Sequence, residues 1–247
     1  MKKIFIYLLL CVSLFAKTIN VAVAANMSYA IVQLSKEFTN SHKNIKINTM
    51  IGSSGKLTAQ IMRNAPFDMF LSANMKYPTK LYQNGFTLTK PKIYAKGKLI
   101  LLSTKSRDFS QGLNILFNKN IKQIAIANPK TAPYGIATKE TLQNKKIYNK
   151  LKSKFIYGES IGQTLIFTIK ACDIGFVAKS SIYAKSMNKY KQNINYIDID
   201  TNLYNPIKQG VVILKHAKNS DATQQFYNFL FSQKAKKILE QFGYITQ

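Results

Sequence analysis

Residues 18–30 read TINVAVAANMSYA, and the pattern of this stretch changes in its middle. The apolar run stops at Asn26, and beyond it Ala30, Leu34 and Phe38 recur at helical spacing. We therefore expect a β-strand that ends in small residues and runs into a helix capped by Asn26, whose side chain can accept a hydrogen bond from the first turn. A helix start carries unpaired amides and a partial positive charge, so this junction predicts an anion-binding end.

Three further stretches show the same change from a strand-like run to a helical pattern, at Ser53-Ser54, Pro133-Tyr134 and Ser160-Ile161. Serine at a helix start can cap the helix or donate its hydroxyl to a ligand, and capping is the commoner role. Proline suits the first position of a helix, which leaves the amide of Tyr134 or Gly135 open to a ligand. Four converging helix starts would bind a small oxyanion without a salt bridge.

Strand-like and helix-like stretches alternate along the chain, which predicts an α/β fold with mostly parallel sheets flanked by helices. A strand near residue 98 opens a second unit, and a strand near residue 205 returns towards the first. We expect two lobes joined by two crossing segments, with residues 17–97 plus 210–247 in lobe I and residues 98–209 in lobe II. Residues 221–243 have an amphipathic pattern that predicts one closing helix, ended by Gly243.

Residues 1–16 have the layout of a secretory signal peptide. Lys2 and Lys3 precede a largely apolar stretch, and Ala16 is a small residue suited to cleavage. Cys11 follows Leu10, where a lipoprotein signal requires a small residue, so lipidation is not favoured. No later stretch approaches the roughly 18 consecutive apolar residues of a membrane span. We expect an exported, periplasmic protein that is cleaved near Ala16.

The chain is strongly basic, with a net charge of +26 that becomes +24 without Lys2 and Lys3. Such a charge is typical of proteins that bind nucleic acid or a membrane surface. Arginine, which bidentate phosphate and base contacts favour, occurs only at Arg63 and Arg107, and the lysines are spread along the chain. A basic nucleic-acid or surface-binding module is therefore an alternative from another functional class, and no nucleic-acid partner is expected.

The sequence offers little material for catalysis. The only histidines are His42 and His216, both beside lysines, so neither a serine–histidine set nor a histidine metal site is expected. Cys172 lies among apolar residues and is expected to be a buried small hydrophobe; it would be the nucleophile if the protein were an enzyme. Asp198 and Asp200 share one strand face and are expected to be solvated. We expect no enzymatic activity, no metal cation and no cofactor.

Four groups of segments follow one another along the chain: VAVAANMSYA (21–30); GSSGKLTAQI (52–61) with FDMFLSAN (67–74); NPKTAPYGIATKETL (128–142); and GESIGQTLIF (158–167) with DIGFVAKSS (173–181). Taken together and in this order, they resemble the periplasmic molybdate-binding proteins of ABC importers. The resemblance implies the two-lobed, type II periplasmic binding-protein fold, with a mostly parallel sheet in each lobe and the ligand cleft between the lobes. It also implies that the protein captures molybdate, usually tungstate as well, through neutral hydrogen bonds and delivers it to a membrane permease.

Four positions of this chain match the binding positions of that family. Asn26 stands where the family uses a serine or asparagine, and Ser54 stands at the serine of the second junction. Tyr134 falls at the alanine or tyrosine that follows the proline, and Ile161 falls at the valine whose backbone amide binds an oxygen. The resemblance therefore implies that these four residues bind the oxyanion.

The neighbouring residues Ala25, Ser53 and Ser160 are expected to belong to the same site. Some members of the family add a tyrosine hydroxyl at a position that is Ala178 in this chain, and the hydroxyl of Tyr134 is a candidate to replace it. A receptor for another tetrahedral oxyanion, such as sulfate, is the closest alternative, because charge alone does not separate the two dianions. We expect a monomer.

Overall fold

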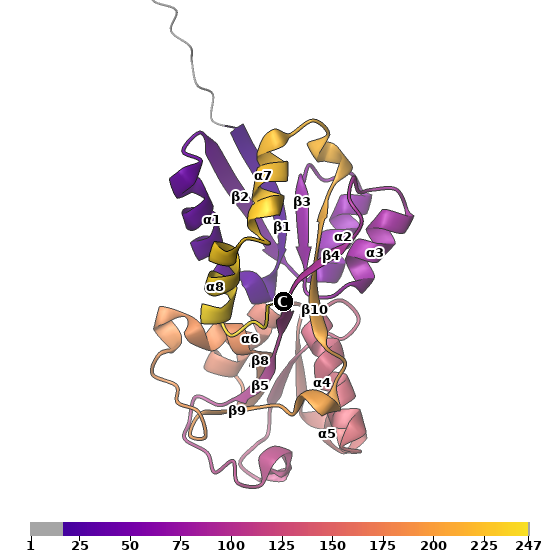
Figure 1. The fold of residues 1–247 in the computed structure, drawn as a ribbon. Helices are drawn as coiled ribbons and strands as arrows, with labels where there is room; N and C mark the ends of the chain where they lie inside the picture. Colours follow the sequence, from indigo (N-terminus) through magenta and orange to yellow (C-terminus); the bar gives the residue numbers. More distant parts are fainter. Residues whose placement is uncertain (1–16, 247) are drawn as a thin grey trace, which may run out of the picture.

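The computed structural model describes residues 17–246, so the predicted signal peptide lies outside the described residues. Two five-stranded β-sheets form the two halves of the molecule, with strand orders β2-β1-β3-β10-β4 and β7-β6-β8-β5-β9. Figure 1 shows the sheets one beyond the other, with helices on the faces of each and the C-terminus between them. The predicted two-lobed α/β architecture is confirmed.

The first sheet carries the opening strand near its centre. Strand β1 (Lys17–Ala24) pairs in parallel with β2 (Ile45–Gly52) and β3 (Met69–Ser72). Strand β10 (Ile207–Ile213) is antiparallel to β3 and to β4 (Lys92–Gly97). Four strands therefore run in one direction and β10 runs in the other.

Both faces of β1 are buried, which explains its nearly continuous apolar sequence. Ile19, Val21 and Val23 pack in one core cluster with α1 (Ala30–Ser41), α7 (Asp221–Phe229) and α8 (Gln233–Gln241). Ala22 faces the opposite side and packs with residues of α2 (Ser54–Met62) and α3 (Lys76–Gln83). Alternate side chains of one strand thus hold two helical layers in place.

The second sheet repeats this plan. Strand β6 (Ile124–Ala127) is parallel to β7 (Phe155–Gly158) and β8 (Ile174–Ala178), and β5 (Leu99–Leu102) is antiparallel to β8 and β9 (Tyr196–Asp198). Leu99 and Leu101 pack in the cluster that includes residues of α4 (Pro133–Asn144), and Ile100 and Leu102 pack with Leu165 of α6 (Ile161–Lys170). Each sheet is therefore mixed, with one reversed strand among four that share a direction.

Short helices fill the connections. Helix α5 (Tyr148–Leu151) follows α4. The 3-10 helices are η1 (Ala25–Met27), η2 (Gly112–Phe117), η3 (Lys152–Lys154), η4 (Lys179–Tyr183), η5 (Lys185–Met187), η6 (Thr201–Leu203) and η7 (Lys215–Ala217). No helix among the described residues is both long and apolar enough to cross a bilayer.

The chain passes between the sheets at two places. Lys98 separates β4 in the first sheet from β5 in the second, and residues 199–206 separate β9 from β10. Residues Ile207–Gln209 already pair with β4, so the returning strand joins the first sheet from its first residue. The C-terminal segment returns to the same region, because Lys96 and Ile245 exchange backbone hydrogen bonds of 2.8 and 2.9 Å. The lobe limits given above stay a prediction.

Two local predictions are wrong. Asn26 does not cap α1: it lies inside η1, and Tyr29 precedes the first residue of α1. The closing segment is two helices, because Ser232 caps a new helix by accepting a hydrogen bond from the Ala235 amide. The amphipathic pattern continues across this break, so periodicity alone did not reveal it. The strand β4 was also absent from the predicted elements.

Candidate functional site

A small buried cavity lies where the four junctions meet. Its wall contains every predicted site residue except Ser160, namely Ala25, Asn26, Ser53, Ser54, Tyr134 and Ile161. The space open to a water-sized sphere is about 10 Å³, close to what a single water molecule needs. The lobes are therefore closed tightly over the site.

The junction after β2 offers both an amide and a hydroxyl. Ser53 accepts a hydrogen bond from the Lys56 amide at 3.4 Å and so caps α2, while Ser54 is the first helical residue and is 1% exposed. The Ser54 hydroxyl accepts from the Ala73 amide at 3.0 Å, and no hydrogen bond donated by this hydroxyl is found among residues 17–246. Its proton is available to an acceptor in the cavity.

The junction before α4 presents a backbone amide. Pro133 is the first residue of the helix, and Gly135 donates its amide to the Ala132 carbonyl at 2.9 Å. The Tyr134 amide has no acceptor in the described part of the chain, as expected near a helix start. Of the two amides that the sequence left open, Tyr134 is the one that remains free to bind a ligand.

The Tyr134 side chain points away from the first turn of α4 to the crossing segment. A Cβ built on Gly97 would collide with the Tyr134 hydroxyl, so the close approach requires glycine there. Burial raises the pKa of Tyr134 well above its usual range, and the hydroxyl has no partner among the described residues. Its replacement of a hydroxyl missing at Ala178 stays a prediction.

The junction before α6 repeats the division of roles seen at α2. Ser160 accepts a hydrogen bond from the Gln163 amide at 3.2 Å and caps the helix. Ile161 follows as the first helical residue, and its amide has no acceptor among residues 17–246. Ser160 thus supports the helix whose first amide faces the cavity region.

The first junction differs from the other three. The Asn26 side-chain nitrogen donates to Gln209 Oε1 at 2.9 Å and to the Tyr244 hydroxyl at 2.8 Å. These two bonds use both hydrogens of the amide group. The donors that η1 can offer to a ligand are therefore its backbone amides.

The donors around the cavity are electrically neutral. No charged side chain belongs to its wall among the described residues, and α2, α4 and α6 all begin there. Aligned helix starts supply roughly half a positive charge each, which favours an anion. The arrangement can bind an oxyanion by hydrogen bonds.

Several contacts join the two lobes around this cavity. The Gly55 amide donates to the Thr131 carbonyl at 2.9 Å, and the Tyr77 hydroxyl donates to the Lys130 carbonyl at 3.3 Å. Lys56 forms an ion pair with Glu159 near the edge of the site, with both side chains at least half exposed. These contacts belong to the closed arrangement.

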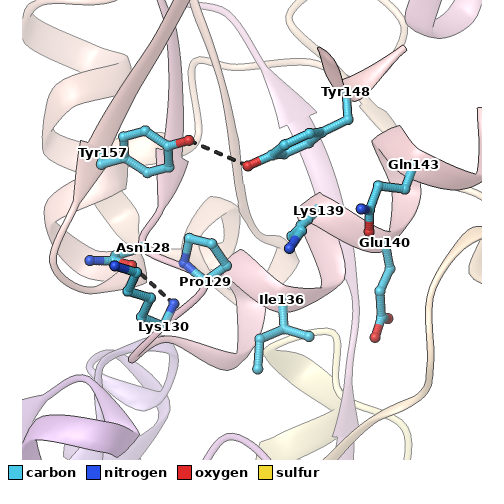
Figure 2. Close-up of a pocket in the computed structure, with 9 residues that line it drawn as sticks. All are labelled: Asn128, Pro129, Lys130, Ile136, Lys139, Glu140, Gln143, Tyr148 and Tyr157. Carbon is cyan, nitrogen blue, oxygen red and sulfur yellow. Dashed lines mark hydrogen bonds between the residues drawn. The ribbon is translucent and has the colours of Figure 1, made fainter. Parts of the chain in front are cut away.

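A second, much larger cavity of about 660 Å³ lies beside α4 and holds none of the predicted residues. Figure 2 shows Lys139 beneath the Tyr148 ring, with the Tyr148 and Tyr157 hydroxyls directed at one another. Those hydroxyls are 3.4 Å apart, and burial together with this contact raises the pKa of Tyr157 to about 12. Lys130, Lys139 and Glu140 bring charged side chains to the wall of this cavity, whereas no charged side chain among the described residues lines the small one.

The candidates for catalysis or metal binding are dispersed. Burial raises the pKa of the Cys172 thiol, which opposes thiolate formation. His216 lies 2.8 Å from an Asp68 oxygen, outside the cavity. Among the described residues, no group of three or more histidine, cysteine, aspartate or glutamate side chains could hold a metal ion.

The sequence interpretation missed the small residues that complete the cavity wall. These are Ala24, Ala73 and Ala132. Their signal was present, since small residues at the carboxyl ends of parallel strands let the backbone approach a ligand. Gln209 and Tyr244 had no such signal, because they reach Asn26 only through the fold.

Comparison with known proteins gives a consistent result. A family model described as "Bacterial extracellular solute-binding protein" matches residues 19–245. The chain is 34% identical over 234 residues to the molybdate-binding protein ModA of Azotobacter vinelandii, with 94% of this chain and 91% of the relative covered. It is 27% identical to a putative ABC transporter substrate-binding lipoprotein, YvgL of Bacillus subtilis, with 93% of this chain and 87% of the relative covered.

Solved structures show the same architecture. The periplasmic molybdate-binding protein of Azotobacter vinelandii superposes with a TM-score of 0.85 at 33% identity, covering 93% of this chain and 99% of that one. The sulfate-binding protein SubI of Mycobacterium tuberculosis gives a TM-score of 0.72 at 13% identity, with 92% and 86% covered. The second likeness concerns the fold alone.

Proposed function

Because this chain belongs to the bacterial extracellular solute-binding protein family, we propose that it captures molybdate, and tungstate as well, and delivers the dianion to an ABC permease. The support is a relative at 34% identity that carries the name of a molybdate-binding protein, together with unpaired neutral donors that meet at one cavity. The role is transport and involves no chemical conversion of the ligand.

The observation that carries this proposal is the meeting of unpaired donors in one neutral cavity. The amides of Ser54, Tyr134 and Ile161 lack acceptors among the described residues, and the Ser54 hydroxyl has its proton available. Each hydrogen bond to a charged group contributes very roughly 1.5 to 3 kcal/mol net. Desolvation of a dianion opposes binding, so the donors must be fixed in advance and shielded from water, as two closed lobes provide.

The proposed site consists of the residues assigned from the sequence, with Ser54 as hydroxyl and amide donor and with Tyr134 and Ile161 as amide donors. At Asn26 and Ala25 the backbone is the proposed contact. Ser53 and Ser160 act by capping the helices whose amides bind. No cofactor or metal cation takes part in this mechanism.

The proposed location and partners follow from transport. Residues 1–16 would direct export and be removed near Ala16, which leaves the receptor in the periplasm as a monomer. The permease would recognise the closed, loaded form. The Bacillus subtilis relative, named as a substrate-binding protein of an ABC transporter, supports this partner class.

Thermal unfolding with a panel of anions tests the function. The purified protein lacking residues 1–16 is heated with molybdate, tungstate, sulfate or phosphate. A ligand at about a thousandfold excess over its dissociation constant adds roughly 4 kcal/mol of stability. Stabilisation by molybdate or tungstate supports the proposal, and stabilisation by sulfate alone would make the protein a sulfate receptor.

The alternative function, a basic nucleic-acid or surface-binding module, predicts a different result with the same purified protein. Binding to any polyanion with a steep dependence on salt, and no stabilisation by the four small anions, would replace the receptor assignment with the basic-module alternative.

A further inference from the structure

A cluster of buried polar side chains lies beside the cavity, where β10 and the C-terminal segment come together. Asn26, Gln209, Tyr244 and Ser180 are linked by hydrogen bonds, and each is less than 5% exposed. A buried polar group is costly unless its hydrogen bonds are made. A glutamine with 0% exposure in the strand β10 therefore needs a physical reason.

The orientation of the Gln209 amide is fixed by the backbone. Its nitrogen donates to the Ile207 carbonyl at 3.0 Å, so its oxygen must face the opposite way. That oxygen accepts from the Asn26 side-chain nitrogen at 2.9 Å. The ladder between β10 and β4 is also irregular between Gln209 and Gly210, and a bulge of this kind redirects a side chain.

Asn26 is thereby held from several directions. Its side-chain nitrogen donates to Gln209 and to the Tyr244 hydroxyl, and that hydroxyl donates back to the Asn26 carbonyl at 2.9 Å. Ser180, on the opposite lobe, also donates to the Asn26 carbonyl, at 2.8 Å. Ala25 and Asn26 of η1 line the cavity, and these bonds immobilise the backbone there.

We propose that Gln209 is a positioning residue for the oxyanion site, which acts through Asn26. It touches no ligand. Anchored on the Ile207 carbonyl, it fixes the Asn26 side chain and with it the backbone amides of η1, so that these donors are in place before the anion arrives. The inference rests on the proposed function, since it concerns the affinity of that same site.

The position of Gln209 also connects the site to the crossing strands. Gln209 Nε2 lies 3.1 Å from the place that a Cβ on Gly97 would take, and the Tyr134 hydroxyl is closer still. Gly97 of β4, Gln209 of β10 and Tyr134 of the other lobe thus meet at one point. A displacement of β10 relative to β1 would move the acceptor of Asn26.

A double-mutant cycle on molybdate affinity tests the inference. Gln209→Met keeps the length of the side chain and removes both amide functions, and we expect about tenfold weaker binding. In an Asn26→Ala background the same substitution should have no further effect, because its target is gone. Lys208→Met, the same replacement at the exposed neighbouring position, is the matched control and should change affinity less than twofold.

Gln209→Glu adds a second measurement, the pH dependence of molybdate affinity, which a purely structural role of Gln209 would leave unchanged. A protonated carboxyl can donate to the Ile207 carbonyl and accept from Asn26, whereas the ionised form can only accept. Relative to the wild type at each pH, affinity should be close to normal at acidic pH and fall as pH rises. In the Asn26→Ala/Gln209→Glu protein this dependence should disappear, which separates positioning from simple repulsion of the dianion.

Tyr244→Phe is a second route if the Gln209 variants do not fold. It removes the other partner of Asn26 and keeps the ring, and we expect a threefold to tenfold weaker affinity. If the wild type binds molybdate and both Gln209→Met and Tyr244→Phe bind it with unchanged affinity, the inference is overturned and the proposed function stands. An equal loss for Gln209→Met with and without Asn26 would also overturn it, and a wild type that binds no molybdate would overturn the function itself.

Discussion

The two cavities beside α4 differ in size, charge and construction. The larger has about 660 Å³ and is lined by the side chains of one lobe, with lysines and tyrosines that reach into solvent. The smaller has about 10 Å³, lies between the lobes, and is lined only by neutral residues among those that the structure describes. Volume would favour the first as a ligand site. The unpaired helix-start amides favour the second, because fixed neutral donors suit a small anion.

A charge placed in each cavity gives the largest expected contrast. Ser54→Asp introduces a carboxylate among the proposed donors, and two like charges about 4 Å apart repel by roughly 4 kcal/mol near a protein surface. We expect molybdate affinity to fall by about a thousandfold or more in isothermal titration calorimetry. The matched change in the larger cavity, Gln143→Asp, should alter affinity less than twofold. Equal losses in both variants would remove the distinction.

Removal of the Ser54 hydroxyl measures one donor. Ser54→Ala should weaken binding by about 10- to 100-fold, because a hydrogen bond to a charged group contributes about 1.5 to 3 kcal/mol. Calorimetry with molybdate provides the measurement, and the melting temperature of the unliganded variant provides the control for folding. Unchanged affinity would mean that this hydroxyl does not face the ligand.

Closure of the lobes is required by the smaller cavity alone. A Cβ on Gly55 would lie 2.9 Å from the Thr131 carbonyl oxygen of the opposite lobe, so Gly55→Ala disfavours the closed form. We expect about tenfold weaker molybdate binding by population shift, with the unliganded melting temperature within about two degrees of the wild type. A variant that binds normally would show that closure tolerates this contact or does not limit affinity.

The smallest effects should come from exposed charges. Lys56→Met breaks the ion pair with Glu159, and pairs this exposed contribute about 0.2 to 1 kcal/mol, so affinity should fall no more than about fivefold and less in high salt. Lys139→Met in the larger cavity should have no measurable effect. A larger loss for Lys139→Met than for Lys56→Met would reverse the assignment of the two cavities.

The sequence predicted the junctions because their signals are local. Ser53 and Ser160 cap helices through an amide three residues ahead, and Pro133 fixes its own backbone angle, so each helix start can be located without the fold. The break before α8 was missed although Ser232 uses the same bond, since the apolar pattern runs through it. The strand β4, which contributes few fully apolar residues, gave too weak a periodicity to be distinguished.

Asn26 marks the limit of local inference. Its sequence context indicated a helix cap. Its side chain instead forms hydrogen bonds with Gln209 and Tyr244, which lie 183 and 218 positions further along the chain. No sequence periodicity links Asn26 to these two residues, because β10 and the C-terminal segment bring them together only when both lobes have formed. The direction of the two reversed strands, β5 and β10, is likewise set by these crossings.

The sequence by itself determined the α/β alternation, the starts of α2, α4 and α6 and the neutral character of the donors, since each depends on neighbours within a few residues. The tertiary structure decided which of these donors remain free. It directs the Gly55 amide to the opposite lobe, leaves the Ser54, Tyr134 and Ile161 amides without acceptors, and turns the Asn26 side chain towards Gln209. The physical reason is that a hydrogen bond is made with whatever group lies within about 3 Å, and only the folded chain determines that group.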